Sequence, residues 1–400
     1  MRKMLFSILF LSLLLVNLTG CQNENEGSEG NHVNEVEDLV SFDTTRDTMP
    51  RSLVGSITDL NDDFTNEKKI INKPEREEVR GIYLNPWAIK EEEIGRFIEF
   101  VKASPRFNAV VMDLKDDNGK LTYDSNVELV NEIGADDGAV IADLPSFLKR
   151  FKDEGIYTIA RIVTFKDPFL AEKKSEWALQ RKDGSLWLGP DSIKWLDPYR
   201  EKMWTYVMDI VEEIADSGIN EIQYDYIRFP ENAKKVDQEV EYANADQLNK
   251  DELIEKFLKY SKERLDHYPV LVSADVFGLV TSSTDDMGIG QTWEKMAPHI
   301  DFISPMNYPS HYSAQSYGLQ EPNDQPYALI KAAMEDALER NQSLEIGEEQ
   351  AATIRPWLQD FNYKRTYTKD DVLAQIKALN DLGINEYLIW NPSSKYTELD

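Results

Sequence analysis

Cysteine and histidine are scarce in this sequence. The 400 residues include one cysteine and four histidines. A single cysteine excludes an intramolecular disulfide framework and any cysteine-rich zinc site. Four scattered histidines also give little basis for a histidine-based metal centre, so we expect neither a metal ion nor another cofactor.

Basic residues are also in short supply. Lys and Arg number 44 against 73 Asp and Glu, which gives a formal net charge of −29. A nucleic-acid-binding protein needs a basic face for the phosphates, so this balance argues against a nucleic-acid partner. It leaves open an uncharged ligand such as a glycan. Because 41% of the residues are hydrophobic and 10% are aromatic, the chain can bury a sizeable core.

The apolar run over residues 5–16 falls short of the roughly 20 residues that a membrane-spanning helix needs. It follows two cationic residues and precedes small ones, which is the pattern of a secretory signal. The residues that end in Cys21 resemble the lipobox of bacterial lipoproteins. This resemblance implies that residues 1–20 are removed and that Cys21 carries a diacylglycerol thioether. We therefore expect an extracytoplasmic lipoprotein anchored to the cell membrane. The alternative is an ordinary secretory signal with an incidental cysteine.

Residues 21–76 differ in composition from the rest of the chain. Asn, Glu, Gly, Ser, Asp and Thr dominate there, without a sustained period of 2 or 3.6. This composition predicts a flexible acidic tether between the lipidated N-terminus and a folded domain. No comparable linker follows, so we expect one domain over residues 77–400. We also expect the protein to be a monomer.

Short β-rich runs alternate with longer amphipathic stretches in this domain, which predicts βαβ units and a parallel sheet. Eight strands in about 320 residues suit an α/β fold of the closed (β/α)8 TIM type, usually about 250 residues plus insertions. The competing doubly wound sheet lacks its glycine-rich fingerprint after the first strand. The expected strands are Val79–Asn85, Asn108–Lys115, Tyr157–Phe165, Glu221–Arg228, Val270–Phe277, Asp301–Tyr308, Thr353–Gln359 and Glu386–Asn391. The expected helices are Glu91–Ala103, Ile141–Glu154, Pro198–Ser217, Lys250–His267, Pro326–Arg340 and Thr368–Leu382.

Alternation along the strands separates an apolar face from a face that becomes polar at the C-terminal end. On the fourth strand, Tyr224 is expected to face the helices and Asp225 the interior. On the fifth strand, Ala274 is likewise expected to face the helices and Asp275 the interior. In a barrel of this type, the C-terminal strand ends surround the active site.

Asp225 and Asp275 close neighbouring strands, so their carboxyls are expected to share one pocket. Glycosidic cleavage needs such a pair, because one carboxyl protonates the leaving oxygen while the other attacks or activates water. A distance of about 5–5.5 Å between the two carboxyl groups predicts that the anomeric configuration is retained, and about 6.5–9.5 Å predicts that it is inverted. The sequence leaves both outcomes open. The alternative is a structural ion pair of either aspartate with Arg161 or Arg228.

Other inner strand ends carry aromatic and polar side chains suited to sugar binding, since rings can lie against a pyranose while polar groups engage its hydroxyls. The run Asp116–Gly119 predicts a turn, because it lacks the later ligands of a calcium loop. The candidate substrate-binding residues are Tyr83, Asp113, Lys115, Arg161, Arg228, Asn307, Tyr308, Trp357, Gln359, Trp390 and Asn391.

The chain resembles an uncharacterised bacterial family assigned to the glycoside hydrolases, with a TIM-like barrel. The resemblance covers roughly residues 77–398 and implies a carbohydrate substrate. Barrel glycosidases often place a catalytic carboxylate after the fourth strand, which supports Asp225; their fifth-strand partner is often Glu, where this chain has Asp275. The segments that carry the resemblance are Val79–Asn85, Val111–Gly119, Ala160–Val163, Gln223–Pro230, Ser273–Gly278, Ile303–Tyr308, Ile354–Phe361 and Leu388–Pro392.

Other functions and mechanisms stay open at this point. Residues 304–308 are similar to the sixth-strand motif of chitinase-like barrels, but the fourth strand lacks the acidic Glu of that mechanism until Glu231. We therefore rank a two-aspartate glycoside hydrolase first, with Asp225 as nucleophile or stabilising carboxylate and Asp275 as general acid/base. A glycan-binding lipoprotein without turnover is the second hypothesis. An architectural envelope protein with a closed barrel mouth is the third.

Overall fold

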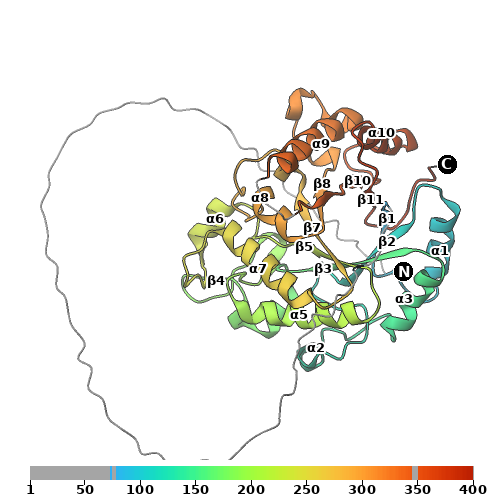
Figure 1. Cartoon of the computed structure of the whole chain (residues 1–400). Coiled ribbons are helices and arrows are strands. Elements are labelled where there is room, and N and C mark those ends of the chain that lie inside the picture. Colours follow the sequence, from blue (N-terminus) through green and yellow to red (C-terminus); the bar gives the residue numbers. More distant parts are fainter. Residues whose placement is uncertain (1–72, 74–77, 345–349, 400) are drawn as a thin grey trace, which may run out of the picture. The chain divides into compact units, whose positions relative to one another are not determined.

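The computed structural model describes residues 73, 78–344 and 350–399. The expected signal peptide, Cys21 and nearly all of the expected tether lie outside these residues. In the described part, parallel strands form a closed barrel with helices around it (Figure 1). The (β/α)8 architecture expected from the sequence is therefore confirmed.

The barrel strands follow one another in chain order, and the last one pairs with the first to close the sheet. Two of them, β9 and β10, are halves of one expected strand, and both pair with β8. They are separated at Pro356, which has no N–H to donate to a ladder. The strands are β1 (Arg80–Leu84), β2 (Ala109–Lys115), β3 (Tyr157–Val163), β5 (Glu221–Asp225), β7 (Leu271–Phe277), β8 (Phe302–Met306), β9 (Thr353–Ile354), β10 (Trp357–Gln359) and β11 (Tyr387–Trp390).

All six expected helices are present, with ends that shift by a few residues. Two of them begin at capping boxes, Asn249 with Glu252 and Thr368 with Asp371, in which side chains satisfy the free backbone N–H groups. Within the described residues, no helix is both long enough and apolar enough to cross a membrane. The six are α1 (Ile94–Ala103), α3 (Leu144–Asp153), α5 (Glu201–Asp216), α7 (Lys250–Leu265), α9 (Pro326–Ser343) and α10 (Lys369–Asn380).

Several short elements were not expected from the sequence, since four to seven residues are too few to show a helical period. A small antiparallel pair, β4 (Gln180–Arg181) with β6 (Val240–Glu241), joins the loops that follow β3 and β5. The additional helices are α2 (Glu128–Ile133), α4 (Pro168–Lys173), α6 (Ala233–Glu239) and α8 (Trp293–Met296).

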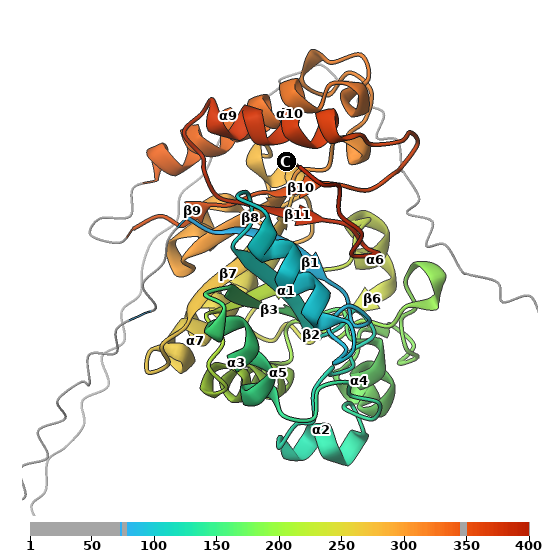
Figure 2. The ribbon, with the colours of Figure 1, turned by 90° about the vertical axis from the view of Figure 1, so that its right-hand side faces the viewer.

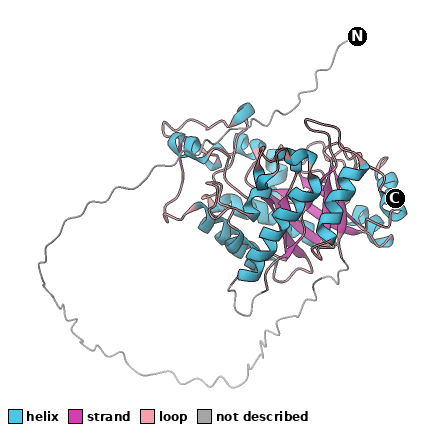
Figure 3. Ribbon diagram, turned by 90° about the horizontal axis from the view of Figure 1, so that it is seen from above, coloured by secondary structure: helices cyan, strands magenta, loops and turns pink. Residues whose placement is uncertain are grey.

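The core has two parts, one between strands and helices and one inside the barrel. Tyr224 belongs to the part between strands and helices, because its hydroxyl lies 2.6 Å from Ser261 Oγ of α7. The strands (magenta) are flanked by the helices (cyan) that cover their outer faces (Figure 3). Inside the barrel, the buried apolar side chains are Val79, Tyr83, Ala109, Val111, Ile159, Tyr308, Trp357 and Leu388.

The C-terminal segment occupies the place where an eighth helix would follow β11. Arg106 Nε donates to the Leu399 carbonyl (2.8 Å), and the Asn85 amide donates to Ser394 Oγ (2.9 Å). The Tyr396 ring also lies beside Phe100 of α1. Residues 391–399 therefore cover α1 and the loop after β1, while α9 and α10 pack side by side (Figure 2).

A buried ion pair holds the amino-terminal end of the barrel interior together. Arg355 Nη1 donates to Glu221 Oε2 (3.0 Å), and Arg355 Nη2 also bonds Glu221; neither side chain is exposed. Ser273 Oγ (2.5 Å) and the Tyr157 hydroxyl (3.0 Å) donate to the same carboxylate. The Glu221 charge is therefore neutralised and hydrogen-bonded on both oxygens.

Candidate active site

Arg161 on β3 is the centre of a buried cluster of charges at the C-terminal end of the barrel. Its Nη1 donates to Asp113 Oδ1 at 2.7 Å. Its Nε and Nη2 both donate to Asp225 Oδ2, at 2.8 and 2.6 Å. Asp117 Oδ2 accepts from both Nη atoms at 3.2 Å. One guanidinium thus orients three carboxyls from β2, β5 and the loop after β2.

Asp113 is the inner carboxyl of β2 and is bound from two sides. Besides Arg161, the Tyr83 hydroxyl donates to Asp113 Oδ2 at 2.5 Å. Burial raises the pKa of Asp113 to about 6, although the Arg161 charge opposes the shift. Burial, followed by the Asp113 charge, also raises the pKa of Tyr83 well above its usual range. Asp113 can therefore change its charge near neutral pH.

Asp225 and Asp275 lie on neighbouring paired strands. Tyr224 of β5 pairs with Ala274 of β7. The residues that follow them, Asp225 and Asp275, therefore lie next to each other on the two strands. Adjacent strands are about 4.8 Å apart, and both side chains point into the barrel. The structure thus brings the two carboxyls together at one end of the barrel interior.

Asp275 is buried and accepts a hydrogen bond from an indole. Only 2% of the residue is exposed, and its Oδ1 accepts the indole N–H of Trp357 at 2.7 Å. Burial raises the pKa of Asp275 well above its ordinary value, and the negative charge of Asp225 raises it further. Two carboxyls in unequal environments can take the separate roles of acid and base.

The residue after Asp225 adopts an unusual backbone conformation. Tyr226 has φ of 49°, in the left-handed region that bulky residues rarely occupy. This turn directs the Tyr226 amide back to Asp225 Oδ1, to which it donates at 2.6 Å. Both oxygens of Asp225 are thereby fixed, Oδ2 by Arg161 and Oδ1 by the backbone N–H of Tyr226.

Aromatic side chains line the same end of the barrel. The rings of Tyr83 and Trp390 are stacked, with centroids 4.0 Å apart, and Trp357 meets Trp390 edge-on at 5.5 Å. Trp390 is partly exposed, whereas Trp357 is buried. Burial and the charges of Asp275 and Asp225 raise the pKa of Tyr308, which therefore belongs to the same group.

The remaining candidate side chains make contacts within the protein. Lys115 is fully buried and lies 2.7 Å from Asp167 Oδ2. The Asn307 amide donates to the Tyr312 hydroxyl (2.7 Å), and the Gln359 amide donates to the Phe361 carbonyl (2.9 Å). Two further candidates are Asn391, whose amide donates to the carbonyls of Asp360 and Lys395, and Arg228, whose guanidinium packs on the rings of Trp195, Tyr226 and Phe277.

Asp117 and Lys166 are part of the cluster and were missed in the sequence. The expected turn is present, since the Gly119 amide donates to the Asp116 carbonyl at 3.0 Å. Asp117 stands on this turn with 38% of its side chain exposed, and its Oδ1 accepts from Lys166 Nζ at 2.9 Å. Burial alone would raise the pKa of Asp117, but Arg161 and Lys166 outweigh it and hold the pKa well below its usual range. An acidic residue just past an inner strand end was the available signal.

A family model described as "putative glycosyl hydrolase domain" matches residues 81–396. Among solved structures, the glycoside hydrolase domain of PgaB (BpsB) from Bordetella bronchiseptica has a TM-score of 0.53 at 15% identity. That match covers 80% of this chain and 95% of the other. At this identity, the likeness concerns the fold.

Two other solved structures are similar with lower TM-scores. A hypothetical protein from Ruminiclostridium thermocellum ATCC 27405 is 34% identical over 48% of this chain and 96% of its own, with a TM-score of 0.42. The glycoside hydrolase domain of a PelA variant from Pseudomonas aeruginosa is 9% identical over 80% of this chain and 96% of its own, with a TM-score of 0.45. No curated protein matches the chain.

Proposed function

The chain belongs to this family of "putative glycosyl hydrolase" domains, and from that premise we propose that it hydrolyses a glycosidic bond in a cell-surface or extracellular carbohydrate. The observation that carries the proposal is the pairing of Asp275, whose pKa is strongly raised, with Asp225 on the adjacent strand. An un-ionised acid beside a carboxylate is the arrangement that cleavage of a sugar acetal requires.

The two carboxyls take different steps of the reaction. Asp275 donates its proton to the glycosidic oxygen, and the leaving sugar departs as an alcohol. Asp225 attacks the anomeric carbon and forms a glycosyl ester. Asp275, now a carboxylate, takes a proton from water, and the resulting hydroxide displaces Asp225. The strand spacing of about 4.8 Å supports the short carboxyl separation of retaining enzymes, so we propose retention of configuration.

The other side chains of the cluster position these two. Arg161 fixes Asp225 Oδ2 and neutralises part of the charge of three carboxyls. The partly exposed Trp390 offers a ring on which a pyranose can lie, and Asp117 offers an exposed carboxylate to its hydroxyls. The reaction as proposed needs no cofactor.

The test is release of new reducing ends from a panel of polysaccharides, covering neutral, amino-sugar and acidic types. Wild-type protein is expected to release product from at least one member. Asp225→Asn/Asp275→Asn is expected to fold with the wild-type circular dichroism spectrum and to release none. Product release by the double variant at the wild-type rate would remove both proposed roles.

One observation favours a second candidate function, glycan binding without turnover. Both Arg161 N–H groups that face Asp225 bond the same oxygen, so this carboxylate is tied to a cation within the protein. A structural ion pair of this kind would leave Asp225 unavailable as a nucleophile. Calorimetry that detects oligosaccharide binding, together with no product after long incubation, would favour the binder over the enzyme.

We also propose that the protein is an extracytoplasmic lipoprotein, anchored through Cys21 as its N-terminal sequence suggests. The carbohydrate substrate would then be met at the cell surface. Metabolic labelling with a radioactive fatty acid is expected to mark the wild-type chain and to fail with Cys21→Ser. Equal labelling of the two chains would exclude Cys21 as the anchor.

A further inference from the structure

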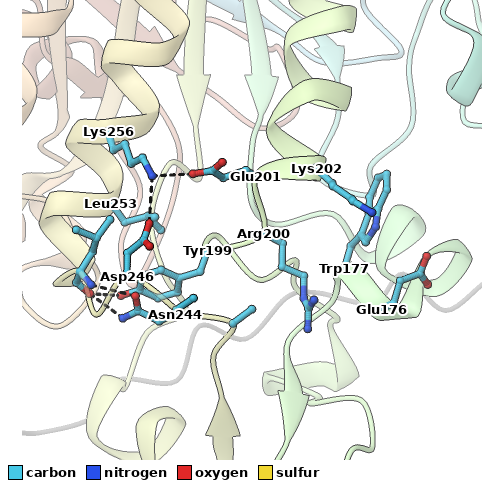
Figure 4. A pocket seen from close by; sticks show the side chains of 13 residues that line it. Glu176, Trp177, Tyr199, Arg200, Glu201, Lys202, Asn244, Asp246, Leu253 and Lys256 are labelled. Atoms are coloured by element: carbon cyan, nitrogen blue, oxygen red, sulfur yellow. Dashed lines mark hydrogen bonds and ion pairs between the residues drawn. The ribbon is translucent and has the colours of Figure 1, made fainter. Parts of the chain in front are cut away.

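A cavity of about 450 Å³ has a lining that includes no residue of the charge cluster. Figure 4 shows the side chains that line it. Its volume lies within the range of small-molecule sites. It is formed by the β3–α5 connection, the β5–α7 connection and the first turns of α5 and α7. The lining residues that the argument uses are Trp177, Tyr199, Arg200, Asn244, Leu253 and Lys256.

The cavity lies on the same end of the barrel as the proposed active site. The two connections leave the C-terminal ends of β3 and β5, and these ends carry Arg161 and Asp225. The Tyr199 ring of the cavity packs at 5.3 Å against Phe229, four residues after Asp225. The cavity and the proposed active site are therefore both built from segments at the C-terminal end of the barrel.

One side of the cavity is held by internal contacts. Lys256 binds Glu201 Oε1 at 2.7 Å and Asp246 Oδ2 at 3.5 Å (Figure 4). Asn244 and the Tyr199 hydroxyl both bond the Leu248 carbonyl, at 2.8 and 2.9 Å. This wall is preorganised, so binding a ligand there would cost little ordering of side chains.

The other side of the cavity carries Arg200 and Trp177. The Arg200 side chain is 35% exposed, while its buried Nε forms a long ion pair with Asp197 Oδ2 at 3.9 Å and makes no hydrogen bond within the described residues. Nε is closed to a ligand, so the exposed remainder of the guanidinium supplies the N–H groups that a ligand hydroxyl in the cavity can accept from. The half-buried Trp177 contributes an aromatic ring to the lining of the same cavity.

The lining of the cavity carries equal numbers of acidic and basic side chains, which favours an uncharged ligand over an ionic one. Three carboxylates face three cations, so an ionic ligand gains no net attraction, and the whole chain carries −29. An aromatic ring with mixed donors and acceptors instead suits an uncharged sugar ring. The charged lining residues are Glu176, Glu201 and Asp246, with Arg200, Lys202 and Lys256.

We propose that this cavity is a second saccharide-binding site, which holds an uncharged pyranose unit of a longer chain while another part of that chain lies at Asp225 and Asp275. The ligand chemistry rests on the proposed function. Trp177 supplies the stacking surface, and Arg200 donates to the sugar hydroxyls.

The experiment uses the full chain carrying Asp225→Asn/Asp275→Asn, so that binding is measured without turnover. Calorimetry with cellohexaose, maltohexaose and chitohexaose is expected to show binding of at least one. Adding Trp177→Ala should raise its Kd at least tenfold, whereas Trp177→Phe, which keeps a ring, should stay within threefold. Tyr327→Ala on α9 is the matched aromatic control and should leave the Kd unchanged.

Three results would overturn the site: no binding of any uncharged hexasaccharide, an unchanged Kd with Trp177→Ala, or binding of hexagalacturonate alone. If the wild type releases product but Trp177→Ala leaves the Kd unchanged, the second site is excluded while the proposed function stands. Binding that Trp177→Ala abolishes, with no product from the wild type, supports the site while the proposed function fails.

Discussion

Asp275→Asn is expected to lower kcat/KM by about 10²–10⁴ on any carbohydrate that the wild type hydrolyses, the usual contribution of a positioned general acid. Asparagine has nearly the same shape, and its oxygen can still accept the Trp357 indole N–H that Asp275 accepts at 2.7 Å. The variant should therefore fold as the wild type does while lacking the proton that the leaving group needs.

The pH profile separates this role from a structural one. Burial and the Asp225 charge raise the pKa of Asp275, so its proton is present below that raised pKa and is lost above it. The wild-type kcat/KM should fall as the pH rises through this value, and the residual activity of Asp275→Asn should lack that fall. Asp153→Asn, at an exposed site on α3, is the control. An Asp275→Asn activity within threefold of the wild type contradicts the assignment.

Arg355→Met is expected to lower the free energy of unfolding by about 3–5 kcal/mol, the cost of leaving one partner of a buried ion pair behind. Glu221 is wholly buried and receives three of its hydrogen bonds from Arg355 and Ser273. Methionine fills most of the space but neutralises nothing, so the Glu221 charge would remain uncompensated inside the barrel.

Urea unfolding followed by circular dichroism measures this loss. Lys149→Met, which removes an exposed i,i+4 pair with Asp153 on α3, is the matched control and should cost less than about 1 kcal/mol. The double variant Arg355→Met/Glu221→Gln should recover part of the loss, because no buried charge is then left. A loss for Arg355→Met as small as that of the control would show that the pair does not hold the barrel interior.

The barrel was predictable because its signals are local. Each strand is a short β-rich run between amphipathic stretches, and parallel strands buried on both faces need such runs. The meeting of Asp225 and Asp275 follows from two facts, adjacent strands and matching inward positions, and both could be inferred from alternation along residues 221–225 and 271–275.

The partners of individual side chains were less predictable, because they depend on register and on loops. The pairing of β2 with β3 shifts between Asp113 and Lys115, so a strict period of two cannot be carried through to Lys115, which binds Asp167 instead. Asp117 lies just past an inner strand end, which is a signal in the sequence, but its contact with Arg161 depends on how the turn after β2 folds. The short end after β11 likewise gave no indication that the terminal segment packs on α1.

The most direct test of the account is to titrate the Asp275 carboxyl itself. Carbon-13 NMR of aspartate-labelled protein would follow the side-chain resonance of Asp275 in the wild type and in Asp225→Asn. The resonance is identified because it is missing from the spectrum of Asp275→Asn. We expect a pKa well above the ordinary value of about 3.9 in the wild type, and a lower pKa once the Asp225 charge is removed. An ordinary pKa of Asp275 in the wild type would contradict a shared acid–base pair at the barrel end. A raised pKa that stays the same in Asp225→Asn would contradict it as well.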